Sequence, residues 1–269
     1  MFKAAVSVGQ YVPGDSLIHR LDPRTKVLCV VVAASAIFIG AGWLGLALAA
    51  CFVFLVMGLT GIHPWMYFRG MSAIWVLLLL TFVLNLLLTP GETLVGAGVL
   101  HITKEGLVVG SQMFFRLALL IFVAFTLTLT TSPVNLTAGL ESIMSPVKKL
   151  GLPAHEIAMM MTIALRFVPT LMTEADKIAK AQSSRGAGFG GGDGLFSRVK
   201  SLLPLFVPLF VSAIRSAEEL ATAMEARCYR GGANRTRMNA LRMSAKDCTA
   251  FLITVAALGA SLWLKRLSA

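Results

Sequence analysis

Two arginines occupy equivalent places in two matching segments of the chain. Residues 175–186 (ADKIAKAQSSRG) and 217–228 (AEELATAMEARC) correspond at an offset of 42, which aligns Arg185 with Arg227. Both segments are rich in helix-forming residues and end near glycine, so each is predicted to be a helix with an arginine at its C-terminal end. An arginine there gains about 0.3–1 kcal/mol from the helix dipole. Its guanidinium can also form paired hydrogen bonds with a partner's carboxylate or carbonyl groups, and the duplication favours two equivalent sockets.

Small residues recur at matching places in the same two segments. Within each segment the two alanines lie one helical turn apart. Small residues on a helix face let the backbone of another helix approach closely. These faces are therefore candidates for contact with a partner helix, at Ala175, Ala179, Ala217 and Ala221.

The chain shows no pattern typical of catalysis or of a bound metal or cofactor. It lacks the G-x-x-x-x-G-K-[ST] sequence of ATP-hydrolysing proteins, so it is not expected to hydrolyse ATP. Residues 186–191 match G-x-G-x-x-G, but the strand and crossover helix that a dinucleotide site needs are not predicted around them. The four histidines lack the spacing of metal ligands, and the four cysteines contain no C-x-x-C pair. No catalytic residue, metal site or cofactor is expected.

The composition indicates an integral membrane protein. Apolar residues make up 57% of the 269 residues and charged residues 14%, against about 25% charged in an ordinary soluble domain. The mean hydropathy is +0.79. The net charge of +11 raises the alternative of nucleic-acid binding. However, residues 134–246 hold 15 of the 24 basic and 8 of the 13 acidic residues, which favours a basic cytoplasmic region facing anionic lipid and no nucleic-acid partner.

Long runs without charge predict about five transmembrane helices and an all-α polytopic fold. A span needs roughly 17–25 apolar residues. The glycines at 40, 42 and 45 predict a tight turn between the first two spans. Two polar residues, Asn85 and Arg116, fall within spans; we expect structural roles for both, an interhelical hydrogen bond in the case of Asn85. The predicted spans are residues 25–41, 43–60, 73–88, 107–131 and 248–264.

The flanking charges predict the orientation in the cell membrane. Basic residues before the first span place the N-terminus in the cytoplasm, and the net acidic loop 89–106 is expected outside. The fourth span then delivers residues 134–246 to the cytoplasm. The pair Lys265-Arg266 after the last span disagrees with this orientation, but the earlier bias is larger.

Residues 134–246 differ in kind from the spans. Charges recur there at helical spacing, and prolines are expected to divide the region into several short amphipathic helices at the inner membrane face. We therefore predict a membrane region at 1–133, a cytoplasmic helical region at 134–246 and a C-terminal span at 247–269. The prolines concerned are Pro146, Pro153, Pro169, Pro204 and Pro208.

Several segments together resemble the transmembrane T component of energy-coupling factor (ECF) transporters. The arginine ends are similar to the two X-Arg-X motifs of that family, and Cys228 departs from the small residue, often glycine, that usually ends the second motif. The motifs are Ser184-Arg185-Gly186 and Ala226-Arg227-Cys228, and further similarity covers HRLDPRTK (19–26), RFVPTL (166–171) and residues 204–232.

The resemblance implies a non-catalytic coupling subunit. In this family a small hydrophobic S component captures a vitamin or a transition-metal ion, two ABC-type ATPases hydrolyse ATP in the cytoplasm, and the T component joins them. Arg185 and Arg227 would each dock on one ATPase. The alanine faces would contact the S component.

Two other functions are weighed against this one. The permease subunit of a conventional ABC importer carries a motif similar to E-A-A-x-x-x-G; Glu174 and Ala175 begin similarly, but Lys180 occupies the glycine position. A membrane enzyme or channel would need converging polar residues within the spans, where only Asn85 and Arg116 are prominent.

Overall fold

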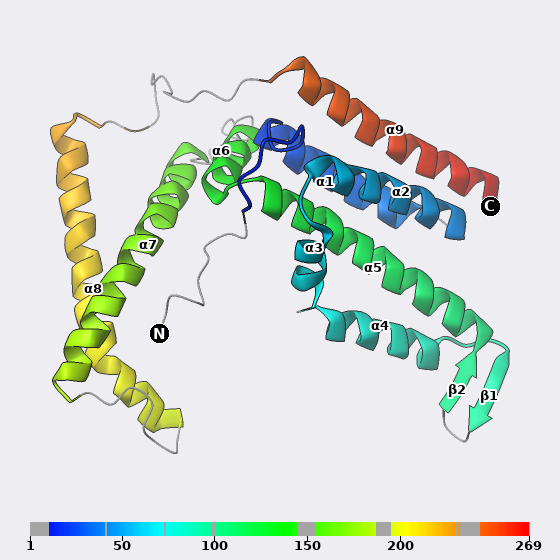
Figure 1. Ribbon diagram of the computed structural model, residues 1–269, viewed down its shortest axis with the longest axis horizontal. Coiled ribbons are helices and arrows are strands. Elements are labelled where there is room, and N and C mark those ends of the chain that lie inside the picture. Colours follow the sequence, from blue (N-terminus) through cyan, green and yellow to red (C-terminus); the bar gives the residue numbers. More distant parts are fainter. Residues whose placement is uncertain are drawn as a thin grey trace. The chain divides into compact units, whose positions relative to one another are not determined.

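The computed structural model describes residues 11–40, 42–72, 74–97, 100–144, 154–186, 195–229, 231 and 243–268 (Figure 1). Helices dominate these ranges, and one short β-hairpin interrupts them. The elements are α1 (Pro23–Ile39), α2 (Gly42–Thr60), α3 (Pro64–Met71), α4 (Trp75–Leu88), β1 (Thr93–Ala97), β2 (Leu100–Thr103), α5 (Lys104–Thr130), α6 (Pro133–Met144), α7 (Ala154–Ser184), α8 (Leu195–Ala226) and α9 (Ala245–Ser268).

Contacts divide the chain into two compact units. The bundle unit comprises Gly9–Ile143 and Ala240–Ala269, and so contains α1–α5, most of α6, and α9. The helix-pair unit comprises Met144–Asn239 together with Met1–Val8, and contains α7 and α8. The chain passes from the bundle unit into the helix pair after α6, and it returns before α9.

Helices occupy all five predicted spans. α2 is apolar on all sides, and α1 is apolar beyond its first turn, as expected for helices in a membrane. α2, α5 and α9 are each long and apolar enough to cross a membrane, and α3 and α4 together reach that length with a bend of 63° at their junction. α1 has 17 residues, at the lower limit for a span. The chain is therefore an all-α polytopic membrane protein apart from its hairpin.

The core of the bundle unit is centred on α5. This helix packs against α1, α2, α3 and α4, while α9 packs against α1 and α2. Tyr67 on α3 is fully buried beside Phe122 of α5, and the two rings meet edge to face at 6.4 Å. The Tyr67 hydroxyl lies 3.1 Å from Oγ1 of Thr60 at the end of α2, which satisfies both groups in the apolar core.

The hairpin was not predicted. β1 and β2 pair antiparallel within the loop expected between residues 89 and 106, and Val95 is opposite Ile102. The sequence analysis treated residues 89–106 only as a net acidic loop. The hairpin leads directly into α5, whose N-cap is Thr103: its hydroxyl accepts a hydrogen bond from Gly106 N–H at 3.0 Å.

The expectation of several short, proline-broken helices in residues 134–246 was wrong. Pro169 lies inside the 31-residue α7, and Pro204 and Pro208 lie inside the 32-residue α8. Each proline removes one backbone donor, but a helix next to membrane or partner helices tolerates this loss. Two of the prolines in that expectation, at 146 and 153, lie outside the described residues.

Candidate functional site

The C-terminal end of α7 presents Arg185 in a defined cap. The helix ends at Ser184, and Arg185 follows as the C-cap residue. Gly186 has φ +87°, and its N–H donates to the Ser183 carbonyl at 3.0 Å. A left-handed residue directly after the cap is a common way to end a helix, and glycine adopts it without a steric penalty. All three residues of this motif are exposed.

The C-terminal end of α8 also places a left-handed residue directly after an arginine. The Cys228 N–H donates to the Glu225 carbonyl at 2.8 Å, and the Tyr229 N–H donates to the Met224 carbonyl at 3.0 Å. This pair of bonds defines a Schellman motif, in which Arg227 is the C-cap residue. Cys228 has φ +56°, in the left-handed region that L-residues rarely adopt. Ala226, Arg227 and Cys228 are exposed.

The two arginine motifs therefore match in geometry as well as in sequence. In both, the arginine is the C-cap residue and the next residue is left-handed. Cys228 thus adopts the left-handed conformation that Gly186 adopts in the first motif. The last turns differ in one bond: the Arg185 N–H donates to the Gln182 carbonyl at 3.1 Å, three residues back, and the Arg227 N–H donates to the Ala223 carbonyl at 3.3 Å, four residues back.

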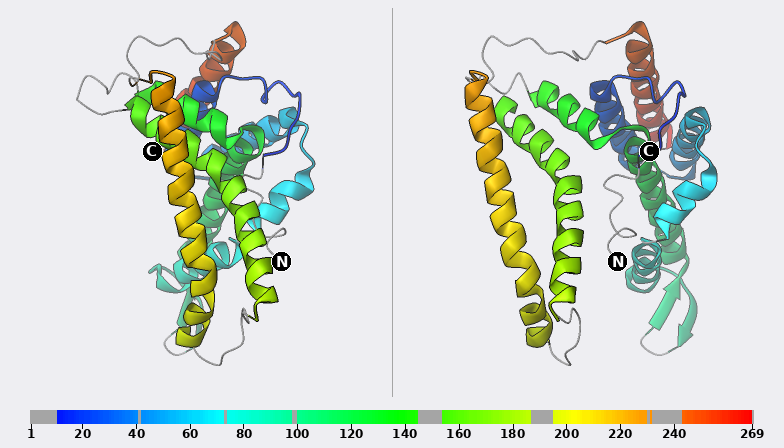
Figure 2. Two further views of the ribbon diagram at one scale, coloured as in Figure 1. Left: turned by 90° about the vertical axis from the view of Figure 1, so that its left-hand side faces the viewer. Right: turned by 60° about the vertical axis from the view of Figure 1, so that its left-hand side comes forward.

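The two arginines lie at opposite ends of the helix pair. α7 and α8 pack against each other, and two views show them running antiparallel, with α8 beginning near the end of α7 (Figure 1, Figure 2). A helix of 32 residues is about 48 Å long. Two arginines separated by a distance of this order would need two separate sockets, because no single small groove could hold both.

Both helices of the pair are strongly amphipathic and almost unburied. Within the described side chains of α7 and α8, Ala158 alone is buried. A large apolar surface without cover marks a site for a protein or membrane partner. α7 is also apolar and long enough to cross a membrane, but its amphipathicity distinguishes it from α1 and α2.

The predicted alanine positions lie on this pair with different exposure. Ala175 and Ala179 on α7 are half-buried, whereas Ala217 and Ala221 on α8 are exposed. The main apolar surface lies earlier on α8, and sequence reasoning missed it. The Phe206 and Phe210 rings stack at 6.3 Å and are 64% and 57% exposed. The uncharged run at residues 201–214 was the available signal.

The two polar residues within spans have structural partners. Arg116 on α5 donates from Nη2 to the Gly40 carbonyl at 2.8 Å, and so caps the C-terminus of α1. Asn85 does not make the expected interhelical bond: its amide donates to the Thr81 carbonyl of its own helix at 2.8 Å. In a membrane an intrahelical acceptor one turn away satisfies the amide without a partner helix.

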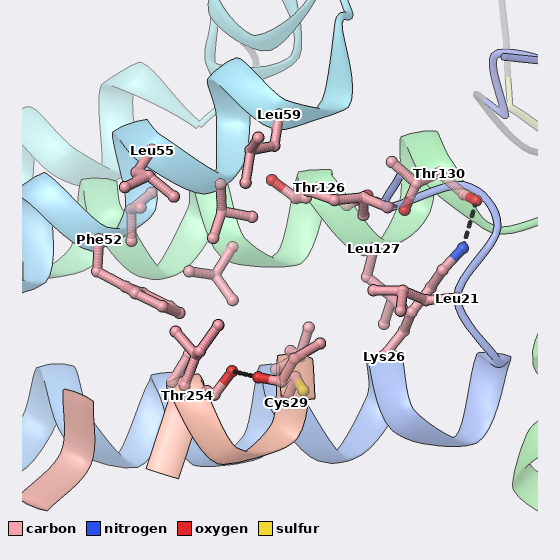
Figure 3. Close-up of a pocket in the computed structure, with 18 residues that line it drawn as sticks. Leu21, Lys26, Cys29, Phe52, Leu55, Leu59, Thr126, Leu127, Thr130 and Thr254 are labelled. Carbon is pink, nitrogen blue, oxygen red and sulfur yellow. Dashed lines mark hydrogen bonds between the residues drawn. The ribbon is translucent and has the colours of Figure 1, made fainter. Parts of the chain in front are cut away.

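The described residues contain no group of three or more His, Cys, Asp or Glu side chains placed to hold a metal ion. The bundle unit has a cavity of about 190 Å³ between α1, α2, α5 and α9, with a predominantly apolar lining (Figure 3). Its threonine hydroxyls donate to carbonyls of their own helices, as Thr126 does to Phe122 and Thr254 to Ala250. The lining also includes Lys26 and Cys29 of α1.

Comparison with known proteins gives consistent matches over nearly the whole chain. The profile of the CbiQ family, described as "Cobalt transport protein", matches residues 14–238. The "Energy-coupling factor transporter transmembrane protein EcfT" of Thermosediminibacter oceani is 51% identical over 249 residues, which cover 93% of this chain and 94% of the relative. The proteins of the same name from Heliobacterium modesticaldum and Bacillus subtilis are 50% identical over 266 residues (97% and 98% coverage) and 44% identical over 260 residues (96% and 97%).

Proposed function

Because the chain belongs to the CbiQ/EcfT family of energy-coupling factor transporter transmembrane proteins, we propose that it couples two cytoplasmic ABC-type ATPases to a substrate-binding S component. In this proposal Ser184-Arg185-Gly186 docks on one ATPase and Ala226-Arg227-Cys228 docks on the other. The chain itself performs no catalysis. Its transport cargo, a vitamin or a transition-metal ion, is set by the S component.

The duplicated cap is the observation that carries this proposal. Two exposed arginines, each followed by a left-handed residue and placed at opposite ends of an antiparallel helix pair, suit two similar sockets on two similar subunits. Each arginine is exposed at the end of its helix, where its guanidinium can form paired hydrogen bonds with a carboxylate or with carbonyl groups. Truncating one partner of a buried charged pair typically costs 2–5 kcal/mol of binding free energy or more, so two such contacts would dominate the interface.

The uncovered apolar surface of the helix pair supports an S-component site. Phe206 and Phe210 are exposed over more than half of their surface, and the small residues Ala217 and Ala221 lie further along α8. A small hydrophobic membrane protein has the complementary surface. The helix pair would then carry the ATPases at its ends and the S component on its apolar face, with residues 134–246 on the cytoplasmic side.

Affinity purification tests the proposal. The tagged chain, purified from its native cells in a mild detergent, is expected to bring two related ABC ATPases and one or more small hydrophobic membrane proteins, identified by mass spectrometry. The small proteins would also reveal the cargo. Recovery of a second copy of this chain with a soluble binding protein would instead indicate a conventional ABC importer, and recovery of the chain alone would contradict the coupling role.

A further inference from the structure

The segment before and at the start of α1 contains a buried polar cluster that the docking function does not use. Asp22 and Lys26 are each 6% exposed, and Asp247 at the start of α9 is 4% exposed. Charged groups are rarely buried to this extent unless they are paired and hydrogen-bonded. The cluster lies wholly within the bundle unit, close to where the chain leaves for the helix pair and where it returns.

Lys26 connects the cluster to the C-terminal end of α5, from which the chain continues through α6 into the helix-pair unit. The Lys26 ammonium donates to the Thr130 carbonyl at the end of α5 at 2.9 Å (Figure 3). It also donates to the His19 carbonyl at 3.1 Å. The Val12 N–H donates to the Leu129 carbonyl at 3.0 Å. The C-terminal end of α5, which the chain follows into α6, is thus tied to the N-terminal segment by two hydrogen bonds.

α6 itself is held by close backbone packing. A Cβ atom placed on Gly139 would lie 3.0 Å from Cβ of Pro23 and 3.3 Å from the Arg24 nitrogen. Glycine therefore permits α6 to contact the first turn of α1 more closely than any other residue would. α6 is the last described element before the chain enters the helix-pair unit.

Asp22 and Asp247 connect the cluster to the start of α9, where the chain returns from the helix-pair unit. The Asp247 carboxylate accepts a hydrogen bond from the Asp22 N–H at 2.7 Å with one oxygen, and from the Ser244 N–H at 2.7 Å with the other. Asp22 in turn caps α1 by accepting from the Arg24 N–H at 2.9 Å. The start of α9 is thus tied to the same turn of α1 that holds α5 and α6.

We propose that residues 22–26 anchor the C-terminal end of α5, α6 and the start of α9 to one another, so that the bundle unit keeps one geometry at both points where the chain connects to the helix-pair unit during ATP-driven movement of α7 and α8. This inference rests on the proposed coupling function. A buried polar cluster is a weak source of stability compared with apolar packing, but its directional bonds impose one geometry. A coupling subunit needs that property, because α7 and α8 can transmit a movement only if the bundle unit to which they are connected keeps its own geometry.

Two variants break the anchor at separate points. Asp247→Asn leaves one acceptor oxygen for two N–H donors, and Gly139→Leu forces α6 away from Pro23. Two controls make the same chemical changes elsewhere: Asp15→Asn, where the side chain is 96% exposed, and Gly259→Leu, where a Cβ atom would meet open space. All four are placed in the complete complex with its ATPases.

The decisive measurement is the distance distribution between spin labels on two helices of the bundle unit. In a cysteine-free background, labels at the exposed positions Asn135→Cys on α6 and Leu252→Cys on α9 are measured with and without a non-hydrolysable ATP analogue. The wild type and both controls are expected to give a narrow distribution that stays unchanged when the analogue binds. Asp247→Asn and Gly139→Leu are expected to retain the ATPases but to give a broad distribution.

The outcomes separate this proposal from the coupling function. Narrow distributions in both anchor variants would overturn the anchor and leave the coupling role intact, whereas failure of the wild type to bind ATPases would overturn the coupling role. Hydrogen exchange in the unmutated complex gives an independent test. The Asp22 and Ser244 amides should stay protected during ATP hydrolysis, and exchange there at the rate of unstructured amides would refute the anchor. Asp247→Asn should accelerate these amides about fivefold or more.

Discussion

Glycine at position 228 should strengthen the cap of α8. Cys228 has φ +56°, and an L-residue in the left-handed conformation costs roughly 1–2 kcal/mol. Glycine avoids this cost but loses more conformational freedom on folding, worth roughly 0.5–1 kcal/mol. Cys228→Gly should therefore stabilise the cap by about 0.5–1 kcal/mol. Gly186→Ala, at φ +87°, should destabilise the matching cap of α7 by a similar amount.

Amide hydrogen exchange measures this difference locally. The Tyr229 N–H bonds to the Met224 carbonyl only when the cap is formed. Its exchange should slow about two- to fivefold in Cys228→Gly, and exchange of the residue 186 amide should accelerate by a similar factor in Gly186→Ala. Ser183→Ala, a helical position beside the cap, serves as the control. Faster exchange of Tyr229 in Cys228→Gly would refute the shared cap geometry.

Three further outcomes are expected. Arg116→Met should lower the unfolding free energy by about 1–3 kcal/mol, because a buried carbonyl of α1 loses its donor, and thermal unfolding in detergent should show no such loss for the exposed Arg69→Met. The double variant Phe206→Glu with Phe210→Glu should release the S component and retain the ATPases in a pull-down. Each ring is exposed in the chain alone, and covering it with the S component would contribute about 1.5–3 kcal/mol of binding free energy. In a cysteine-free chain, Asp193→Cys should react with an impermeant reagent in inside-out vesicles but not in intact cells; labelling of intact cells would refute the cytoplasmic orientation.

The sequence predicts the helices well because their signals are local. A span is a run of apolar residues, and each predicted run contains a helix. The arginine caps are equally local: the offset of 42 aligns two segments that end in the same geometry. Only the conformation of Cys228 needed the structure, because cysteine gives no sequence indication of a left-handed residue.

The errors arise where distant or surrounding groups decide the structure. Prolines at 169, 204 and 208 predict helix ends by local rules, but the amphipathic helices continue through them. Asn85 finds its acceptor one turn away instead of across the bundle. The anchor joins Asp22 to Asp247, 225 residues apart, so no pattern along the chain reveals it.

Charge reversal at the two caps tests the central claim most directly. Arg185→Glu and Arg227→Glu, alone and combined, are compared with Arg166→Glu and Arg215→Glu, which reverse exposed arginines elsewhere on the same helices. The recovery of both ATPases with the tagged chain is quantified by mass spectrometry. Each cap variant should reduce recovery and the double variant should abolish it, while both controls and membrane insertion stay at the wild-type level. Wild-type recovery of the ATPases by the double variant would contradict the docking role of the two arginines.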